Sequence, residues 1–325
     1  MITSRSDFHV GGIAVRPGTR SHCELPISKL VTGTEVSLPV MVVHGNHAGP
    51  NVWLTAAIHG DEINGVEIIR RVLAKLDPRH LRGTVLAVPI VNVHGFVAGQ
   101  RYLPDRRDLN RSFPGSARGS LAGRIAHLVM TEVVGRCSVG IDLHTGSDHR
   151  SNLPQIRADL DDAATRALAV SFGAPIMIHS ATRDGSLRQA ATEAGATVLL
   201  YEGGEAWRFG EIAIKAGVDG ILRVFADLGL IEGRFDVEPR PCRTESRSST
   251  WVRARRSGIA HIDVSLGDVV TKGQEMGRLH DSFGRLLGRI TAPVAGIVIG
   301  VSLDPLFNQG DAMVHVASIQ GEETP

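Results

Sequence analysis

The sequence has the composition of an ordinary globular protein, with 325 residues, of which 42% are hydrophobic and 21% are charged. A chain of this length can bury one large core and a smaller second one. Lysine and arginine together number 35 and aspartate and glutamate 34, so the net charge is close to zero. This balance excludes binding to nucleic acid or to a membrane surface through bulk charge.

The sequence contains no evident segment for export or membrane insertion. Residues 1–12 hold no apolar signal core, and no run of about 18 apolar residues occurs. The cysteines Cys23, Cys137 and Cys242 are isolated and odd in number, which argues against a disulfide framework and against a zinc knuckle. We therefore expect a protein of a reducing compartment, the cytoplasm.

The first chemically informative segment follows two predicted strands in residues 22–43, which are separated by a turn at residues 32–34. The apolar residues 52–58 predict another strand, and apolar residues at helical spacing from Ile63 onward predict a helix directly after it. His59 then ends the strand and Glu62 lies in the first turn of the helix. One turn of backbone can therefore direct an imidazole and a carboxylate at the same point.

Such a pair is part of a catalytic zinc site, which takes three protein ligands and leaves a fourth position for water. A second histidine on a separate strand would complete the ligand set. The alternative is that Asp61 or Glu62 only favours the helix N-terminus through capping and the helix dipole, with His59 as a turn residue.

A long polar loop follows the next predicted strand. Residues 84–93 are almost uninterruptedly apolar, which is typical of a strand that is buried on both faces. Residues 95–119 are polar and rich in arginine and proline, and a loop of this length is usually functional or disordered. The arginines of this loop are either solvated surface or, for two or three of them, binders of an anion.

The second candidate histidine lies at the end of a short strand. A helix is predicted for residues 121–134, and residues 140–147 form a strand that ends near His144. Strand geometry places Asp142 and His144 on one face, so Asp142 could orient His144 through a hydrogen bond. His144 is the predicted third ligand; the alternative is a structural histidine at a strand end.

A glutamate ends the last strand of this part of the chain. Helices are predicted for residues 158–172 and 186–194, and strands for residues 174–178 and 196–202. Glu202 follows an apolar run, where an unpartnered carboxylate costs several kcal/mol, roughly, on burial. Because ligands gather at the carboxyl ends of strands in open α/β sheets, Glu202 is the candidate general base. Glu205 is its competitor, and a helix cap near Ala206 is the alternative.

The C-terminal part has a different pattern. Residues 236–250 are polar and unpatterned and are interpreted as a linker between a domain of residues 1–235 and a domain of residues 251–325. Residues 258–274 are echoed by residues 296–311, which predicts a small, pseudo-symmetric all-β sandwich or barrel. This part resembles biotinyl and lipoyl carrier domains. Lys272 is not on the hairpin between the halves, so we expect no cofactor attachment and a packing or assembly role.

Taken together, these motifs resemble those of the succinylglutamate desuccinylase/aspartoacylase family, a branch of the zinc carboxypeptidase superfamily. The resemblance extends over residues 20–230 in motif order. It rests on the segments His59 to Glu62, Arg101-Tyr102, Asp108 to Arg111, Asp142 to His144, and Glu202. It implies an α/β fold with a zinc-carboxypeptidase-like mixed sheet flanked by helices, and a smaller C-terminal all-β domain of the barrel-sandwich type.

The resemblance also implies a role for each motif residue. It implies His59, Glu62 and His144 as ligands of one zinc ion per chain, and Glu202 as the base that activates water. It implies Arg101 as the group that polarises the scissile carbonyl, with Arg106 and Arg107 as rivals because the loop is longer than in aspartoacylase. It implies Asn110 and Arg111 as the residues that hold the substrate carboxylate, for which a planar guanidinium is well suited.

The expected function is that of a zinc-dependent deacylase that cleaves the amide bond of an N-acyl amino acid or a similar small amide. The alternatives are a zinc carboxypeptidase acting on short peptides or cell-wall fragments and, third, a binding protein without catalysis. The sequence leaves open the acyl group, the amine and whether the chain forms a homo-oligomer.

Overall fold

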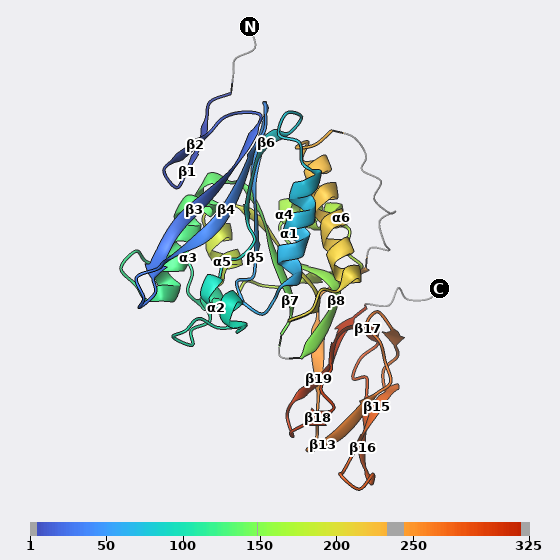
Figure 1. Ribbon diagram of the computed structural model, residues 1–325. Coiled ribbons are helices and arrows are strands. Elements are labelled where there is room, and N and C mark those ends of the chain that lie inside the picture. The colour runs from blue at the N-terminus through green and yellow to red at the C-terminus, as the bar shows by residue number, and fades with distance from the viewer. Residues whose placement is uncertain (1–4, 148, 233–243, 320–325) are drawn as a thin grey trace.

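The computed structural model describes residues 5–147, 149–232 and 244–319 (Figure 1). Its helices are α1 (Asn64–Lys75), α2 (Val93–Ala98), α3 (Leu121–Glu132), α4 (Ala163–Phe172), α5 (Leu187–Glu193) and α6 (Glu211–Asp227), with short 3-10 turns η1 (Leu109–Arg111) and η2 (Val134–Arg136). None of the helices in this part of the chain has the length and apolar character needed to cross a membrane.

The strands of the described residues form three sheets. The large sheet has 13 strands, namely β3 (Thr19–Lys29), β4 (Glu35–His44), β5 (His47–Ala56), β6 (Arg82–Val88), β7 (Val139–Gly146), β8 (Arg150–Ala158), β9 (Ile176–His179), β10 (Thr197–Glu205), β11 (Thr244–Ser246), β12 (Ser249–Arg253), β14 (Val269–Val270), β17 (Gly296–Ser302) and β19 (Ala312–Ser318). The smaller sheets contain β13 (Gly258–Ile262), β15 (Glu275–His280), β16 (Leu286–Thr291) and β18 (Leu306–Phe307), and β1 (Phe8–Val10) with β2 (Ile13–Val15).

The main path through the large sheet has the order β12-β19-β17-β8-β10-β7-β5-β6-β4-β3. Strands β6, β5, β7 and β10 are mutually parallel. Strand β4 is antiparallel to β3 and β6, and β8 is antiparallel to β10 and β17. Helices α1, α4 and α6 cover one face of this sheet, and α3 and α5 cover the other (Figure 1). The predicted fold class is therefore confirmed: a mixed sheet flanked by helices, followed by a smaller C-terminal all-β part.

The sequence of β5 shows why this strand lies at the centre of the sheet. Val52 and Leu54 pack into the core beneath α1, α4 and α6, whereas Trp53 between them packs into the core beneath α3 and α5. A strand that is covered on both faces exposes neither face to solvent, so its side chains can all be apolar. This explains the continuous apolar run of β5. Its parallel neighbours bring their carboxyl ends to the same edge of the sheet.

The sequence predicts a helix over residues 158–172 and no strand before it, so β8 is not among the predicted elements. The structure instead has β8 and, after it, the shorter helix α4. Pro154 lies within β8, and a proline in a central strand normally argues against that assignment. Here β8 pairs with β17 through residues 150–152 and with β9 through residues 155–158. Pro154 falls between these two ladders, so its missing N–H removes no hydrogen bond from either of them.

The C-terminal strands are joined to the large sheet. Strand β17 pairs with β8, and β12 and β19 continue the sheet beyond it. Met276, Ile290, Val298 and Val314 are buried in a separate small core of this part. Residues 236–243 of the predicted linker, which include Cys242, lie outside the described residues. The rest of the predicted linker, residues 244–250, contains β11 and the start of β12.

The packing of α1 against α6 provides a test of the fold. Ile68 is fully buried and touches the site of Gly217 in α6, whereas Ile212 of α6 is 82% exposed. Ile68→Ala leaves a cavity and is expected to lower the free energy of unfolding by about 2–5 kcal/mol. Ile212→Ala is the matched control, with an expected change within about 0.5 kcal/mol. Denaturant unfolding measures both, and equal losses would contradict this packing.

Candidate active site

The functional candidates lie at the edge of the sheet where three parallel strands end. His59 follows β5, and His144 lies in β7. Glu62 lies in the connection between β5 and α1, two residues before α1 begins, and not in the first helical turn as the sequence predicted. Glu202 of β10 is paired with His144 in the parallel ladder between β10 and β7. The parallel register therefore places residues that are far apart in the sequence at one point of the sheet edge.

A close backbone contact brings the arginine-rich loop to the same point. Gly60 lies against α2 and the residues that follow it, and a Cβ atom on Gly60 would be 2.1 Å from the carbonyl carbon of Gly95. The amide of Gly60 donates to the carbonyl oxygen of Arg101 at 3.3 Å. Only glycine leaves room for this close approach. Because His59 precedes Gly60, the contact places Arg101 close to His59.

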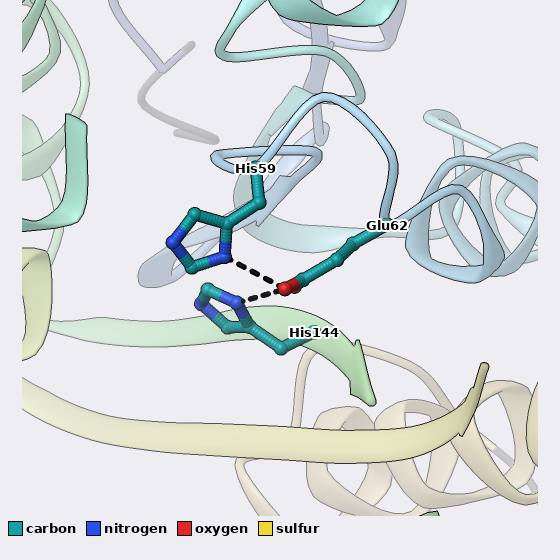
Figure 2. A group of neighbouring side chains, drawn as sticks. All are labelled: His59, Glu62 and His144. Carbon is teal, nitrogen blue, oxygen red and sulfur yellow. Dashed lines mark hydrogen bonds and ion pairs between the residues drawn. The ribbon is translucent and has the colours of Figure 1, made fainter. Parts of the chain in front are cut away.

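His59, Glu62 and His144 form a compact, buried group, each at most 5% exposed. Figure 2 shows both imidazoles directed at the carboxylate of Glu62, which lies between them. The Nδ1 atoms of His59 and His144 are each 2.7 Å from an oxygen of Glu62, the first from Oε1 and the second from Oε2. The donor set of two imidazole nitrogens and one carboxylate oxygen is that of catalytic zinc sites.

The outer nitrogens of both imidazoles face carboxylates. Nε2 of His59 is 3.2 Å from Oδ1 of Asp108, and Nε2 of His144 is 2.9 Å from Oδ2 of Asp142. Asp142 is in turn held by the hydroxyl of Thr55, which donates to Oδ1 at 2.7 Å. A histidine that donates through Nε2 presents the lone pair of Nδ1 to a cation, so the group fits a divalent metal ion.

The charges in this group favour a cation between the ligands. Burial alone would raise the pKa of Glu62, but the two positive imidazoles hold it well below its usual range. Burial opposes protonation of His144, yet the carboxylates of Asp142 and Glu62 raise its pKa well above the usual value. Protons and a divalent cation compete for the same nitrogen lone pairs, so metal binding would displace these protons.

Each residue expected at the site lies on one cavity of about 450 Å³. Its lining includes the candidate ligands together with Glu202, Arg101, Asn110 and Arg111. The side chain of Glu202 is 21% exposed, with Oε2 accepting from Nδ2 of Asn152 at 2.6 Å and Oε1 lying 3.3 Å from Nε of Arg157. The structure thus brings together the residues to which the family resemblance gives a metal-binding, catalytic or substrate-binding role.

Arg101 lies beside the histidine and glutamate group. Its Nη1 atom donates to Oε1 of Glu62 at 2.9 Å, and its Nη2 atom is 4.0 Å from Oδ2 of Asp108. The rival arginines, Arg106 and Arg107, are exposed and are not among the described residues that line the cavity. Of the three, Arg101 is the one that lines the cavity.

Asn110 and Arg111 enter the cavity from the turn η1. The amide oxygen of Asn110 accepts the backbone N–H of Leu187 at 2.9 Å, which ties η1 to the first turn of α5. This bond occupies the oxygen of Asn110 and leaves its amide nitrogen as the group that can meet a carboxylate. Arg111 donates through Nη1 to the backbone oxygen of Asn110.

Several lining residues were not found from the sequence. Asp108, which contacts His59, lies outside this lining, and although it belongs to one of the sequence motifs its role was not predicted. Arg150, Asn152 and Arg157 were missed because β8 was not predicted. Ser249, Trp251 and His315 were missed because no local signal shows that the C-terminal strands reach the site. Arg183 and Arg188 lie before and within α5, and no sequence motif marks them.

The lining is strongly basic. Its arginines outnumber its glutamates, Glu62 and Glu202, by six to two. Arg188 is buried and donates to the backbone oxygens of Ser180, at 2.9 Å, and of Ala181, at 2.7 Å, which are uncharged. A cavity with this balance attracts anions, because buried guanidinium charge is stabilised by an opposite charge.

Comparisons with known proteins agree with the motifs and the fold. The family model "Succinylglutamate desuccinylase/Aspartoacylase catalytic domain" matches residues 48–228. An N-alpha-acetyl-L-2,4-diaminobutyric acid deacetylase of Halomonas elongata is 30% identical over 338 residues, which cover 98% of this chain and 95% of the relative.

Solved structures are similar over most of their length. The product-bound ectoine utilization protein EutE (DoeB) of Ruegeria pomeroyi has a TM-score of 0.83 at 25% identity, covering 92% of this chain and 95% of that one. A succinylglutamate desuccinylase/aspartoacylase of Rhodobacter sphaeroides has a TM-score of 0.82 at 28% identity, covering 92% and 96%. The resemblance inferred from the motifs is confirmed: the chain belongs to the succinylglutamate desuccinylase/aspartoacylase family.

Proposed function

We propose that this protein is a zinc-dependent deacylase that cleaves the amide bond of an N-acyl amino acid or a similar small amide. The observation that carries the proposal is the buried group of His59, Glu62 and His144 at the wall of a basic cavity that also contains Glu202. Membership of a family that includes a deacetylase of an N-acetylated amino acid supports the amide as the bond that is cleaved.

His59 and His144, through Nδ1, and Glu62, through its carboxylate, are the residues that would hold zinc. When bound, zinc supplies Lewis acidity, which polarises an amide carbonyl and makes water a stronger acid. Asp108 and Asp142 keep the two imidazoles in the tautomer and orientation that a ligand needs.

Glu202 would act as the general base. Its carboxylate accepts a proton from water as the water oxygen bonds to the carbonyl carbon. When the carbon–nitrogen bond then breaks, the same carboxyl group gives the proton to the departing amine, so the products are a carboxylate and a free amine. Asn152 and Arg157 hold the two oxygens of Glu202 on the cavity side of β10.

Arginines of the cavity would bind the two oxygen-rich parts of the substrate. Arg101 lies beside Glu62 and can donate to the carbonyl oxygen as negative charge develops on it. Arg111, together with the amide nitrogen of Asn110, can bind the carboxylate of the amino acid. A cavity of about 450 Å³ is of the size that encloses a small molecule.

The role of Glu202 is tested by Glu202→Gln, which keeps the size of the side chain and removes the proton acceptor. With zinc-loaded protein and a panel of N-acetyl and N-succinyl amino acids, kcat is expected to fall about 10²- to 10⁴-fold. Release of the free amine, measured by chromatography, gives the rate, and metal analysis verifies that the zinc content is unchanged.

Glu205→Gln is the matched control, because Glu205 lies 3.6 Å from Arg208 and is not among the described residues on the cavity wall. This variant is expected to keep its activity. A loss below about tenfold in Glu202→Gln would contradict the assignment of the base. Hydrolysis of dipeptides without hydrolysis of any acyl amino acid would indicate a carboxypeptidase instead.

Binding of the substrate carboxylate is tested by Arg111→Ala. Losing a charged hydrogen bond is expected to raise KM roughly 10- to 100-fold for an N-acetyl amino acid. The carboxamide of the same substrate, which lacks the negative charge, is expected to be affected by less than about threefold. Arg107→Ala, which removes an exposed arginine of the same loop, serves as the control. Equal effects on both substrates would contradict this role.

A further inference from the structure

The C-terminal strands supply one wall of the cavity. Ser249 and Trp251 of β12 and His315 of β19 line it. Trp251 and His315 are directly opposite each other in the antiparallel ladder, and their rings stack with centroids 4.4 Å apart. Burial and the nearby charge of Arg157 lower the pKa of His315 to about 3, so this wall is aromatic and uncharged at neutral pH.

A continuous row of residues connects this wall to Glu202. His315 of β19 is paired with Gly300 of β17, and Gly300 is paired with Asn152 of β8. Asn152 is buried, and its Nδ2 atom donates to Oε2 of Glu202 at 2.6 Å. The row thus crosses from the C-terminal strands to the catalytic strands without interruption.

The space at Gly300 in this row is restricted. A Cβ atom there would lie 3.1 Å from Oδ1 of Asn152, 3.2 Å from Cβ of His315 and 3.4 Å from Cη2 of Trp251. The φ angle of Gly300 is not among the positive values, so the backbone does not demand glycine here. The missing side chain instead makes room for the amide of Asn152 between β17 and Glu202.

We infer that Asn152 is a positioning residue for Glu202 and that Gly300, in the C-terminal strands, sets the position of Asn152. This inference rests on the proposed role of Glu202 as the base. A glutamate side chain turns about three bonds, and an amide N–H that is fixed in a buried strand restricts it to one arrangement toward the cavity. Misplacement of a reacting group by about 1 Å can cost roughly 10²-fold in rate.

A double-mutant cycle tests the inference in the full-length, zinc-loaded protein, with the most active acyl amino acid as the substrate. Asn152→Ala is expected to lower kcat roughly 10- to 100-fold, with KM within about threefold. Gly300→Ala is expected to lower kcat roughly threefold to tenfold, because the amide of Asn152 must shift by a few tenths of an ångström. If Gly300 acts through Asn152, adding Gly300→Ala to Asn152→Ala changes kcat no further.

The matched control is Gly288→Ala, at a glycine of β16 in the C-terminal part where a Cβ atom meets nothing within 4 Å. It is expected to leave kcat unchanged. Asn152→Asp preserves the size of the side chain but cannot donate to Glu202, and it is expected to lose at least as much kcat as Asn152→Ala. It keeps the test decisive if the alanine variant does not fold.

Two results would overturn the inference. One is a change in kcat of less than about threefold in Asn152→Ala, or in Asn152→Asp if only that variant folds. The other is a double variant whose loss is the product of the two single losses, because Gly300 would then act independently of Asn152. Full activity of Glu202→Gln would instead reject Glu202 as the base. A failure of the proposed function can therefore be told apart from a failure of the positioning role of Asn152.

Discussion

The carboxylate of Glu62, buried between the imidazoles of His59 and His144, is the interaction on which the rest of the site depends. Removing a carboxylate from water costs several kcal/mol, roughly, unless opposite charge and hydrogen bonds replace the solvent. Here two imidazoles and Arg101 supply them, and Asp108 and Asp142 hold the imidazoles from outside. The parallel strands β5 and β7 maintain this group, since their carboxyl ends meet at one edge of the sheet.

The sequence predicted those parts of the fold and the site that have a local signal. The apolar run before His59 and the helical spacing after Glu62 predicted the junction of β5 and α1, because a strand buried on both faces and an amphipathic helix leave distinct patterns. The same patterns do not reveal which strands become neighbours. Strand β8 was not predicted because its polar residues and Pro154 are typical of a loop. Its pairing with β10 and β17 also depends on contacts between distant segments, which leave no local pattern.

The missed strand matters because it joins the two parts of the chain at the cavity. Asn152 and Arg157 of β8 hold Glu202, while β17 and β19 bring Gly300 and His315 to the other side of Asn152. A packing role for the C-terminal strands, which the repeat alone suggested, is thus extended by their contribution to the cavity wall. The basic lining and the neutral aromatic wall together describe a site suited to a small anionic molecule.

Anomalous X-ray diffraction from crystals of the zinc-loaded protein, recorded on both sides of the zinc absorption edge, tests the central claim most directly. The account predicts one strong anomalous peak per chain, about 2.0–2.2 Å from Nδ1 of His59, Nδ1 of His144 and a carboxylate oxygen of Glu62. A chain without a peak at this point, or with zinc bound only at another group such as Asp159, Asp161 and His179, would contradict it.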